Sequence, residues 1–338
     1  MSKNDLALLV LDNCKEFGQK VEQNLLHIRN EINKKYIAEL DASRFSNGEG
    51  KVIIQDSVRD KEIYIFCDIG NYGVTYKCHG KDHEMMPDEH FQDIKRVISA
   101  LQGYAKKIVL IMPLLYQSRQ DKRIENESLD CALALQELER LGVNNIITFD
   151  VHNICVSNAL LNLSFENSYA SLDILNQIKE KEDINNILVV SPDMGGMTRA
   201  RAYADILKSN VGVFYKRRDL NKVEDGKNKI VEHTYLGDDV KSKNIIIVDD
   251  MIASGSSIIE TIKLLKEKGA GKIYLAVTFA FFTEGIEAFD NCFNKGLFDK
   301  LYTTNLSYIP SKIKDKAWFE EVDLSKRVAE LIKENNYN

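Results

Sequence analysis

The sequence predicts an α/β fold with mostly parallel sheets flanked by helices. Short apolar runs, rich in β-branched residues, alternate with longer amphipathic stretches along the chain. One such stretch, 256–268, places Ile258, Ile262 and Leu265 on one side of a helix with charged residues opposite. Strands that alternate with helices in this way are typical of parallel sheets whose faces are covered by helices.

The strands are predicted at the apolar runs. From the N-terminus these are 6–11, 52–54, 63–67, 107–112, 145–149, 187–191, 211–215, 244–248, 272–279 and 300–304. Helices are predicted between them, at 14–33, 88–103, 126–141, 169–181, 197–208, 256–268 and 323–334. The sequence HTYLGDD, just before the run at 244–248, suits a hairpin or flap strand instead.

Charge and composition exclude several classes of protein. The chain has 338 residues and a net charge of −6, which gives it no overall attraction for nucleic acid or an anionic membrane. Its longest apolar runs fall well below the ~18 residues of a spanning helix. The run at 6–11 lacks a basic flank and meets Asp12, so we do not interpret it as a secretory signal. Six scattered cysteines without a CxxC motif favour reduced thiols and a cytoplasmic location.

The length predicts two domains, at about 150 residues per domain. Both halves show the same rhythm of strands and helices, and the best boundary lies between Asp150 and about Tyr169. We therefore expect an N-terminal domain over 1–160 and a C-terminal domain over 161–338. The boundary is approximate, and it is left open whether the C-terminal helix packs on the N-terminal domain.

Acidic residues stand at the ends of three of the apolar strands. Asp150 follows 145–149, Asp193 follows 187–191, and the pair Asp249 and Asp250 follows 244–248. In open parallel sheets, ligands bind at the carboxyl ends of the strands, so these carboxylates could converge on one cleft. A single Asp of this kind is more often a turn residue or a helix cap, and only the three together favour a ligand site.

The segment 245–265 joins the acidic pair to a loop of small residues and the start of a helix. Small residues let backbone N–H groups approach an anion, and the helix N-terminus adds a positive dipole. The loop therefore predicts a phosphate site. Because adjacent carboxylates would repel phosphate, we expect them to bind sugar hydroxyls, and the whole segment predicts a sugar-phosphate site. The plainer alternative is a Ser N-cap on an ordinary helix.

Other nucleotide-binding patterns are missing. The sequence GAGKI at 269–273 lacks the Walker A spacing, and GEG at 48–50 lacks the third glycine of the dinucleotide fingerprint. No HRD or DFG set of a protein kinase occurs. Any ATP site in this chain must be built without those devices.

Seven segments resemble the ribose-phosphate pyrophosphokinase (PRPP synthetase) family. They span nearly the whole chain in the family's order, and they are SRFSNGE (43–49), QDSVR (55–59), RQDKR (119–123), ITFDVHN (147–153), VVSPDMGGMTRARAYAD (189–205), YKRR (215–218) and DDMIASGSS (249–257). The resemblance implies two type I phosphoribosyltransferase domains with a flap. It also implies transfer of the pyrophosphoryl group of Mg-ATP to the 1-hydroxyl of ribose 5-phosphate, which gives PRPP and AMP for nucleotide biosynthesis. A homo-oligomer is implied as well, usually a hexamer built from dimers.

The resemblance further implies roles for individual residues. Lys216 and Arg218 would be the catalytic cations of a flexible loop, and a Mg²⁺ cofactor would be linked to His152 and Asp193. The ribose-5-phosphate residues would be Asp249, Asp250, Ala253, Ser254, Gly255, Ser256 and Ser257. The ATP-binding residues would be Phe45, Asn47, Glu49, Arg119 and Gln120. Ser57 and Arg59 match the position of an allosteric phosphate or ADP site in the family.

Two other functions stay open from the sequence. Departures from the family at Asn47 and over 70–90 leave room for a non-catalytic regulatory subunit. A phosphoribosyltransferase that consumes PRPP is disfavoured, because such enzymes need neither an N-terminal domain of this kind nor the RQDKR segment.

The segment 70–90 is predicted to be a long loop, since it has many turn residues and little periodicity. It contains Cys78, His79, His83 and His90, but their spacing fits no standard zinc site. An exposed polar insertion is therefore favoured over a zinc site.

Overall fold

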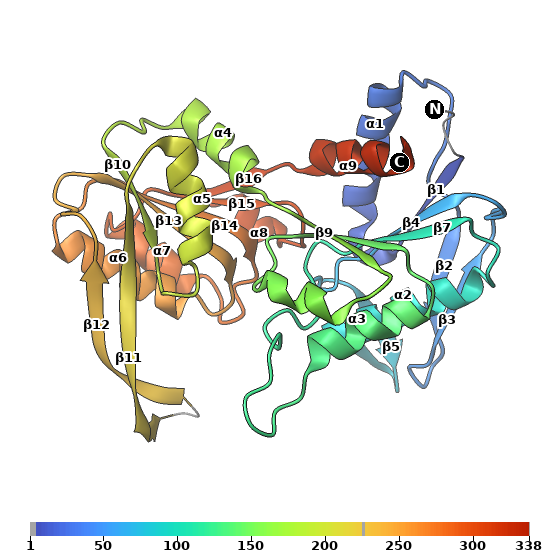
Figure 1. Cartoon of the computed structure of the whole chain (residues 1–338), viewed down its shortest axis with the longest axis horizontal. Coiled ribbons are helices and arrows are strands. Elements are labelled where there is room, and N and C mark those ends of the chain that lie inside the picture. The colour runs from blue at the N-terminus through green and yellow to red at the C-terminus, as the bar shows by residue number, and fades with distance from the viewer. Residues whose placement is uncertain (1–4, 225–226, 338) are drawn as a thin grey trace. The chain divides into compact units, whose positions relative to one another are not determined.

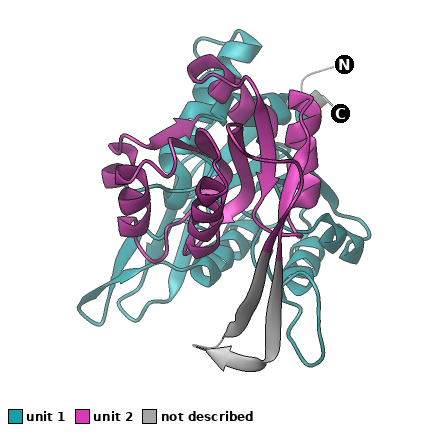
Figure 2. Ribbon diagram, turned by 90° about the vertical axis from the view of Figure 1, so that its left-hand side faces the viewer, with its two compact units in different colours: residues 1–169, 305–310, 323–338 teal, residues 170–304, 311–322 magenta. Residues whose placement is uncertain are grey.

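A computed structural model describes residues 5–224 and 227–337, without the side chains of 216–224, 227–233 and Tyr337. The chain forms two compact units, coloured separately in Figure 2. Unit 1 comprises residues up to Tyr169 together with Asn305–Pro310 and Asp323–Asn338. Unit 2 comprises Ala170–Thr304 and Ser311–Val322.

Unit 1 is built on a five-stranded parallel sheet. Its strands lie in the order β1 (Leu6–Val10), β4 (Glu62–Phe66), β7 (Lys107–Ile111), β8 (Asn145–Phe149) and β9 (Ser164–Ser168). Its helices are α1 (Lys15–Arg29), α2 (Pro87–Ala100), α3 (Asp130–Arg140) and α9 (Ser325–Tyr337), with short 3-10 turns at Asp12–Cys14 and Ile154–Ala159. The inner strands β4, β7 and β8 are almost wholly buried and mostly apolar, because both faces of the sheet are covered.

Two separate hairpins belong to unit 1. The first joins β2 (Leu40–Arg44) to β3 (Gly50–Ile54), and the second joins β5 (Thr75–Cys78) to β6 (Lys81–Glu84). The prediction of a long loop over 70–90 was therefore wrong, since this segment forms the second hairpin and the start of α2. Exposed polar residues alternate too weakly in these short strands to reveal a β-strand.

Unit 2 is built on a seven-stranded sheet. The order is β12 (Lys227–Leu236), β11 (Val211–Glu224), β10 (Ile187–Ser191), β13 (Asn244–Ile252), β14 (Ile273–Ala280), β15 (Lys300–Thr304) and β16 (Phe319–Val322). All neighbours are parallel except β11 and β12, which form the expected hairpin. The helices are α4 (Ser171–Lys181), α5 (Met197–Leu207), α6 (Ser256–Glu267), α7 (Glu287–Asn294) and α8 (Ser311–Lys314). The predicted α/β class, with parallel sheets flanked by helices and a flap hairpin, is confirmed.

The chain crosses between the units more than once. The first division falls after Tyr169, and the last helix, α9, belongs to unit 1. There α9 lies beside α1 (Figure 1), where Asn24 donates from Nδ2 to Ser325 Oγ at 3.0 Å. Arg29, near the end of α1, donates to Asn336 Oδ1 at 2.7 Å in a buried hydrogen bond.

The cysteines form no disulfide. All six are free thiols, and only Cys155 among them is exposed. In the part of the chain that the structure describes, no helix is long and apolar enough to span a bilayer.

Candidate active site

The acidic pair lies at the carboxyl end of β13 in unit 2. Asp250 is buried, and Asp249 is partly exposed beside it. Burial is the main cause that raises the pKa of Asp249 well above its usual range. The neighbouring Asp250 and the charge of Asp193 act in the same direction. The two carboxylates therefore hold negative charge at a place where it is costly, which favours a ligand that donates hydrogen bonds or a cation.

A cation from the neighbouring helix offsets part of this charge. Arg199, in the first turns of α5, lies 3.9 Å from Asp249 Oδ1 and 3.8 Å from Asp250 Oδ2. The Arg199 side chain is only 13% exposed, so the contact is poorly screened by water. Arg199 was not among the residues predicted for the site from the sequence. Its position in the helix after Asp193 was the one signal in the sequence, and that position does not show which carboxylate the side chain contacts.

Asp193 lies in a tight turn between β10 and α5. Ser191 Oγ donates to the Asp193 carbonyl at 2.7 Å, and the Gly196 N–H donates to Asp193 Oδ1 at 3.1 Å. A Cβ at Gly196 would come within 2.5 Å of Ser191 Oγ, so a larger residue there would displace that hydroxyl. Because β10 pairs with β13, Asp193 and the acidic pair share one edge of the sheet. Asp150, the third strand-end carboxylate, belongs to unit 1.

The loop of small residues connects β13 to α6. Gly255 adopts φ +80°, and a Cβ there would come within 2.5 Å of the Phe289 ring. The Ala253 carbonyl accepts from the Thr283 N–H at 2.9 Å, which fixes the start of the loop. Ser254 Oγ and Ser256 Oγ lie 3.1 Å apart, and Ser256 and Ser257 are the first residues of α6. Hydroxyls and helical N–H groups thus gather at one helix N-terminus, beside the acidic pair.

Lys216 and Arg218 lie in β11, and their side chains are outside the described residues. Their backbones pair with His233 and Ile230 of β12. Strand β11 runs parallel to β10, with Val213 level with Ser191, so the backbone at 216–218 continues past the carboxyl end of β10. This is the edge that also carries Asp193 and the acidic pair.

In unit 1, Arg119 and Gln120 lie in the loop between β7 and α3. Arg119 is exposed, whereas Gln120 donates from Nε2 to the Ser128 carbonyl at 2.7 Å and so helps to fold the loop itself. Asn153 donates from Nδ2 to the Asp121 carboxylate. This contact joins the loop to the segment after β8, where His152 is exposed.

Phe45, Asn47 and Glu49 form the turn between β2 and β3, and all three are exposed. Asn47 donates from Nδ2 to Glu49 Oε2 at 3.0 Å, and its Oδ1 accepts from the Glu49 N–H at 3.2 Å. The turn thereby presents an aromatic ring next to a carboxylate, which are the groups that stack on a base and accept from an exocyclic amine.

The predicted metal-linked residues belong to different units, with His152 in unit 1 and Asp193 in unit 2. Among the described side chains, no group of three or more His, Cys, Asp or Glu is arranged to hold a metal ion. The carboxylates beside Asp193 nevertheless fit Mg²⁺, which prefers oxygen and completes its coordination with water and substrate phosphates.

His90, in the 70–90 segment that was considered as a zinc site, is buried. Its ring forms hydrogen bonds with Asn13 Nδ2 and the Asn71 carbonyl.

Ser57 and Arg59 are exposed in the segment before β4. The Arg59 guanidinium lies 3.7 Å from the centroid of the Tyr104 ring. An allosteric role for the two residues stays a prediction.

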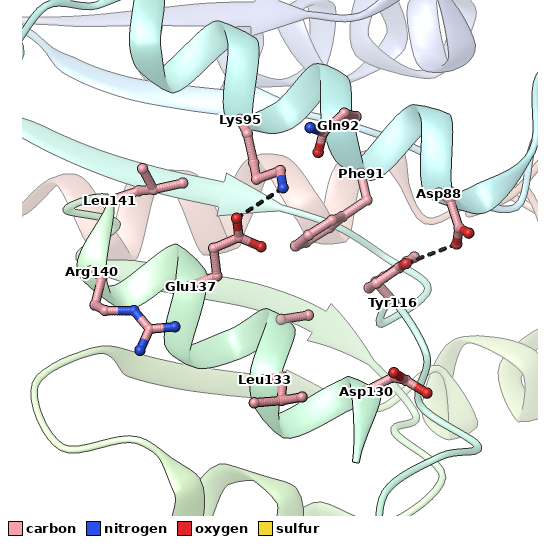
Figure 3. Close-up of a pocket in the computed structure, with 11 residues that line it drawn as sticks. Asp88, Phe91, Gln92, Lys95, Tyr116, Asp130, Leu133, Glu137, Arg140 and Leu141 are labelled. Carbon is pink, nitrogen blue, oxygen red and sulfur yellow. Dashed lines mark hydrogen bonds and ion pairs between the residues drawn. The ribbon is translucent and has the colours of Figure 1, made fainter. Parts of the chain in front are cut away.

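A groove of about 710 Å³ lies between α2 and α3 in unit 1 (Figure 3). Phe91 and Tyr116 stack at 4.2 Å on one side of it, and the Lys95–Glu137 ion pair, at 2.8 Å, crosses it. None of the predicted site residues lines this groove.

Comparison with known proteins points to one family. Residues 6–142 match the N-terminal domain of ribose phosphate pyrophosphokinase, and residues 169–288 match the phosphoribosyl transferase domain. A ribose-phosphate pyrophosphokinase of Ralstonia nicotianae is 30% identical over 248 residues, which are 72% of this chain and 71% of that protein. One of Mycoplasma genitalium is 29% identical over 329 residues, which are 96% of this chain and 92% of that protein.

A solved structure supports the same assignment at the level of the fold. The crystal structure of phosphoribosylpyrophosphate synthetase from Mycobacterium smegmatis superposes with a TM-score of 0.79 over 99% of both chains, at 23% identity. Matching family domains in both units, a relative at 30% identity and a shared fold agree with the seven sequence segments. The chain therefore belongs to the ribose-phosphate pyrophosphokinase family.

Proposed function

We propose that this chain is an active ribose-phosphate diphosphokinase, which transfers the pyrophosphoryl group of Mg-ATP to the 1-hydroxyl of ribose 5-phosphate and gives PRPP and AMP. The observation that carries the proposal is the juxtaposition of the acidic pair with the loop and helix start at 253–257. A phosphate ester and a polyol are the two chemical features of ribose 5-phosphate. The loop and helix start would bind the phosphate, and the acidic pair would bind the hydroxyls.

In this proposal the 5-phosphate binds the N-terminus of α6. The Ser254 and Ser256 hydroxyls and the first N–H groups of the helix would donate to the phosphate oxygens. Asp249 and Asp250 would accept from the ribose 2- and 3-hydroxyls. That contact lowers the cost of keeping both carboxylates charged, because each hydrogen bond stabilises the ionised form.

The nucleotide would be bound by residues of unit 1. Arg119 would offset polyphosphate charge with its exposed guanidinium, and the turn with Phe45, Asn47 and Glu49 would contact adenine. By the family resemblance, that turn contacts a nucleotide on a neighbouring subunit, so the proposal includes a homo-oligomer. Six free thiols, five of them buried, support action in the reducing cytoplasm.

The chemical step would depend on positioning and on stabilising charge. The 1-hydroxyl gives up its proton to solvent and attacks the β-phosphorus of ATP, the bond from that phosphorus to the α,β-bridging oxygen breaks, and AMP leaves with the bonding electron pair. Lys216 and Arg218 would stabilise the negative charge that develops on the phosphates and the leaving AMP. Mg²⁺ bound near Asp193 and the substrate phosphates would neutralise charge on the polyphosphate.

Purified protein incubated with ribose 5-phosphate, ATP and Mg²⁺ tests the proposal. We expect AMP and PRPP in equal amounts, measured by ion-exchange chromatography. A non-catalytic regulatory subunit, assayed without a partner, would form neither AMP nor PRPP. A PRPP-consuming transferase would give neither as well, but would release pyrophosphate from PRPP and a base, and either result would overturn the proposal.

A further inference from the structure

The two hairpins of unit 1 contact each other at their turns. The His79 N–H, in the β5–β6 turn, donates to the Ser46 carbonyl in the β2–β3 turn at 3.2 Å. Gly48, at φ +92°, lies so close to the second hairpin that a Cβ there would be 3.4 Å from Cys78 Sγ. The β5–β6 hairpin therefore lies directly against the turn that carries Phe45, Asn47 and Glu49.

A buried ion pair ties the end of β2 to α2. Arg44 Nη2 lies 2.6 Å from Asp93 Oδ2, and both side chains are only 6% exposed. Arg96 Nη1 lies 2.8 Å from Asp93 Oδ1, so both carboxylate oxygens are paired. A buried pair is costly to break, because the remaining charge is left without compensation. Arg44, the residue directly before the 45–49 turn, is thus held at a fixed point on α2.

Tyr76 connects the second hairpin to both partners. Its ring lies under the Arg44 guanidinium, 5.6 Å from centroid to Cζ. Its hydroxyl donates to Glu89 Oε1 at 2.7 Å, while Glu89 Oε2 accepts from the Met86 N–H at the start of α2. One tyrosine therefore contacts the cation that ends β2 and the carboxylate that caps α2.

We propose that Arg44, Asp93 and Tyr76 are positioning residues for the nucleotide, and that the β5–β6 hairpin holds the 45–49 turn in its binding geometry. This inference rests on the proposed function of that turn as a contact for adenine. An isolated two-stranded hairpin is marginally stable in water, so without these contacts the turn would sample many conformations. A turn that is already ordered binds its ligand without first losing that freedom.

Arg44, Asp93 and Tyr76 would affect nucleotide binding indirectly, because of where they lie. None of the three lies in the 45–49 turn, and the pairs they form are buried or partly buried, so they act through the turn rather than on the ligand. Their loss should weaken nucleotide binding while the chemical step and the ribose site in unit 2 are unaffected.

The first experiment compares Arg44→Met and Tyr76→Phe with Lys77→Met. The control residue Lys77 is on the same hairpin, but its ion pair with Asp82 is 76% and 69% exposed. We expect Arg44→Met to raise the KM for ATP about tenfold and Tyr76→Phe to raise it about threefold, with kcat and the KM for ribose 5-phosphate within about twofold of wild type. Arg44→Lys should restore part of the loss, and Lys77→Met should change nothing.

The second readout is independent of activity. Hydrogen–deuterium exchange should become faster at the Phe45 and Gly48 amides in Arg44→Met, since these donate to the Glu49 and Phe45 carbonyls within the turn. Unchanged exchange in both Arg44→Met and Tyr76→Phe would overturn the inference. The milder Tyr76→Phe, which removes only one hydroxyl, decides the matter if Arg44→Met fails to fold.

The outcomes separate this inference from the proposed function. If wild type forms no AMP, the proposed function fails and with it the role in nucleotide binding, whatever the exchange shows. If wild type is active and the turn loosens while the KM for ATP stays constant, only the positioning role is overturned. A fall in kcat with both KM values unchanged would also contradict it.

Discussion

The Arg199 guanidinium lies 3.8 Å from Asp250 Oδ2, so helix α5 places a mostly buried cation against the carboxylates at the end of β13. This contact explains how two adjacent acidic residues are tolerated at the edge of a buried sheet. In the proposed ribose site it would also give Arg199 a part that the sequence motifs alone did not assign.

Arg199→Met should raise the KM for ribose 5-phosphate by about tenfold to a hundredfold, the range expected when hydrogen bonds to charged groups are lost. Without the cation, the pKa of Asp249 would rise further, and a protonated or displaced carboxylate would bind the hydroxyls poorly. Steady-state kinetics or calorimetric titration with ribose 5-phosphate measures the effect. The control is Arg201→Met on the same helix, where the side chain is 80% exposed. Equal KM values in the two variants would count against the role of Arg199.

Gly255→Ala should abolish binding of ribose 5-phosphate. The new Cβ would meet the Phe289 ring at 2.5 Å, so the loop must move, in addition to the strain of a positive φ. Gly269→Ala is a matched control, because Gly269 has φ +84° but its nearest neighbour would be 3.5 Å away, in Lys241. The control should lose roughly 1–2 kcal/mol of stability and keep its affinity. Calorimetric titration of both variants with ribose 5-phosphate shows whether affinity is lost because the loop changes shape or because the protein is less stable.

The free energy of unfolding should depend on the protonation of Asp68. Burial raises its pKa to about 7, although it accepts hydrogen bonds from Ser307 Oγ at 2.9 Å and the Tyr308 N–H at 2.8 Å. In the unfolded chain the pKa of an Asp side chain is about 3.9, so Asp68 binds its proton more tightly in the folded state. Protonated Asp68 therefore contributes to the free energy of unfolding in full below about pH 4, and this contribution is lost as the pH rises through about 7.

Asp68→Asn should remove this pH dependence, and urea denaturation at pH 5 and pH 8 measures it. Asp12→Asn, at an exposed site in the same unit, is the control and should follow wild type. Identical pH dependence in wild type and Asp68→Asn would show that Asp68 does not titrate in this range.

Lys216→Ala should lower kcat by roughly 10²–10⁴, as the loss of a cation that stabilises the transition state can. The KM for ribose 5-phosphate should change little, because the residue would act on the transferring phosphates. Lys241→Ala, an exposed lysine in the same unit, serves as the control. A Lys216→Ala variant that releases AMP at the wild-type rate would exclude the catalytic role.

The buried parts of the fold could be predicted from the sequence. Strands β4, β8 and β13 each contain a buried apolar run of four residues or more, because helices cover both faces of their sheets, and such runs are recognisable in the sequence. The missed elements lack that signal. Strand β9 (SFENS) lies at the edge of its sheet, and β5 and β6 are short and mostly polar.

The candidate site was predictable where it follows the ends of strands. The rule for parallel sheets pointed to Asp193 and the 249–257 segment, which indeed share one edge. Arg199 was missed because a basic residue in a helix gives no sign of which carboxylate it will meet. The support of the 45–49 turn was missed because Arg44, Tyr76 and Asp93 are distant in sequence and come together only in the folded unit.

The most direct test of the account follows the β-phosphorus of ATP. With ATP labelled at that atom and ribose 5-phosphate as acceptor, the account predicts that the label appears in PRPP and that AMP carries none. Label found in ADP would show ordinary γ-phosphoryl transfer, and label left in unreacted ATP would show no transfer, and either result would contradict pyrophosphoryl transfer by this chain.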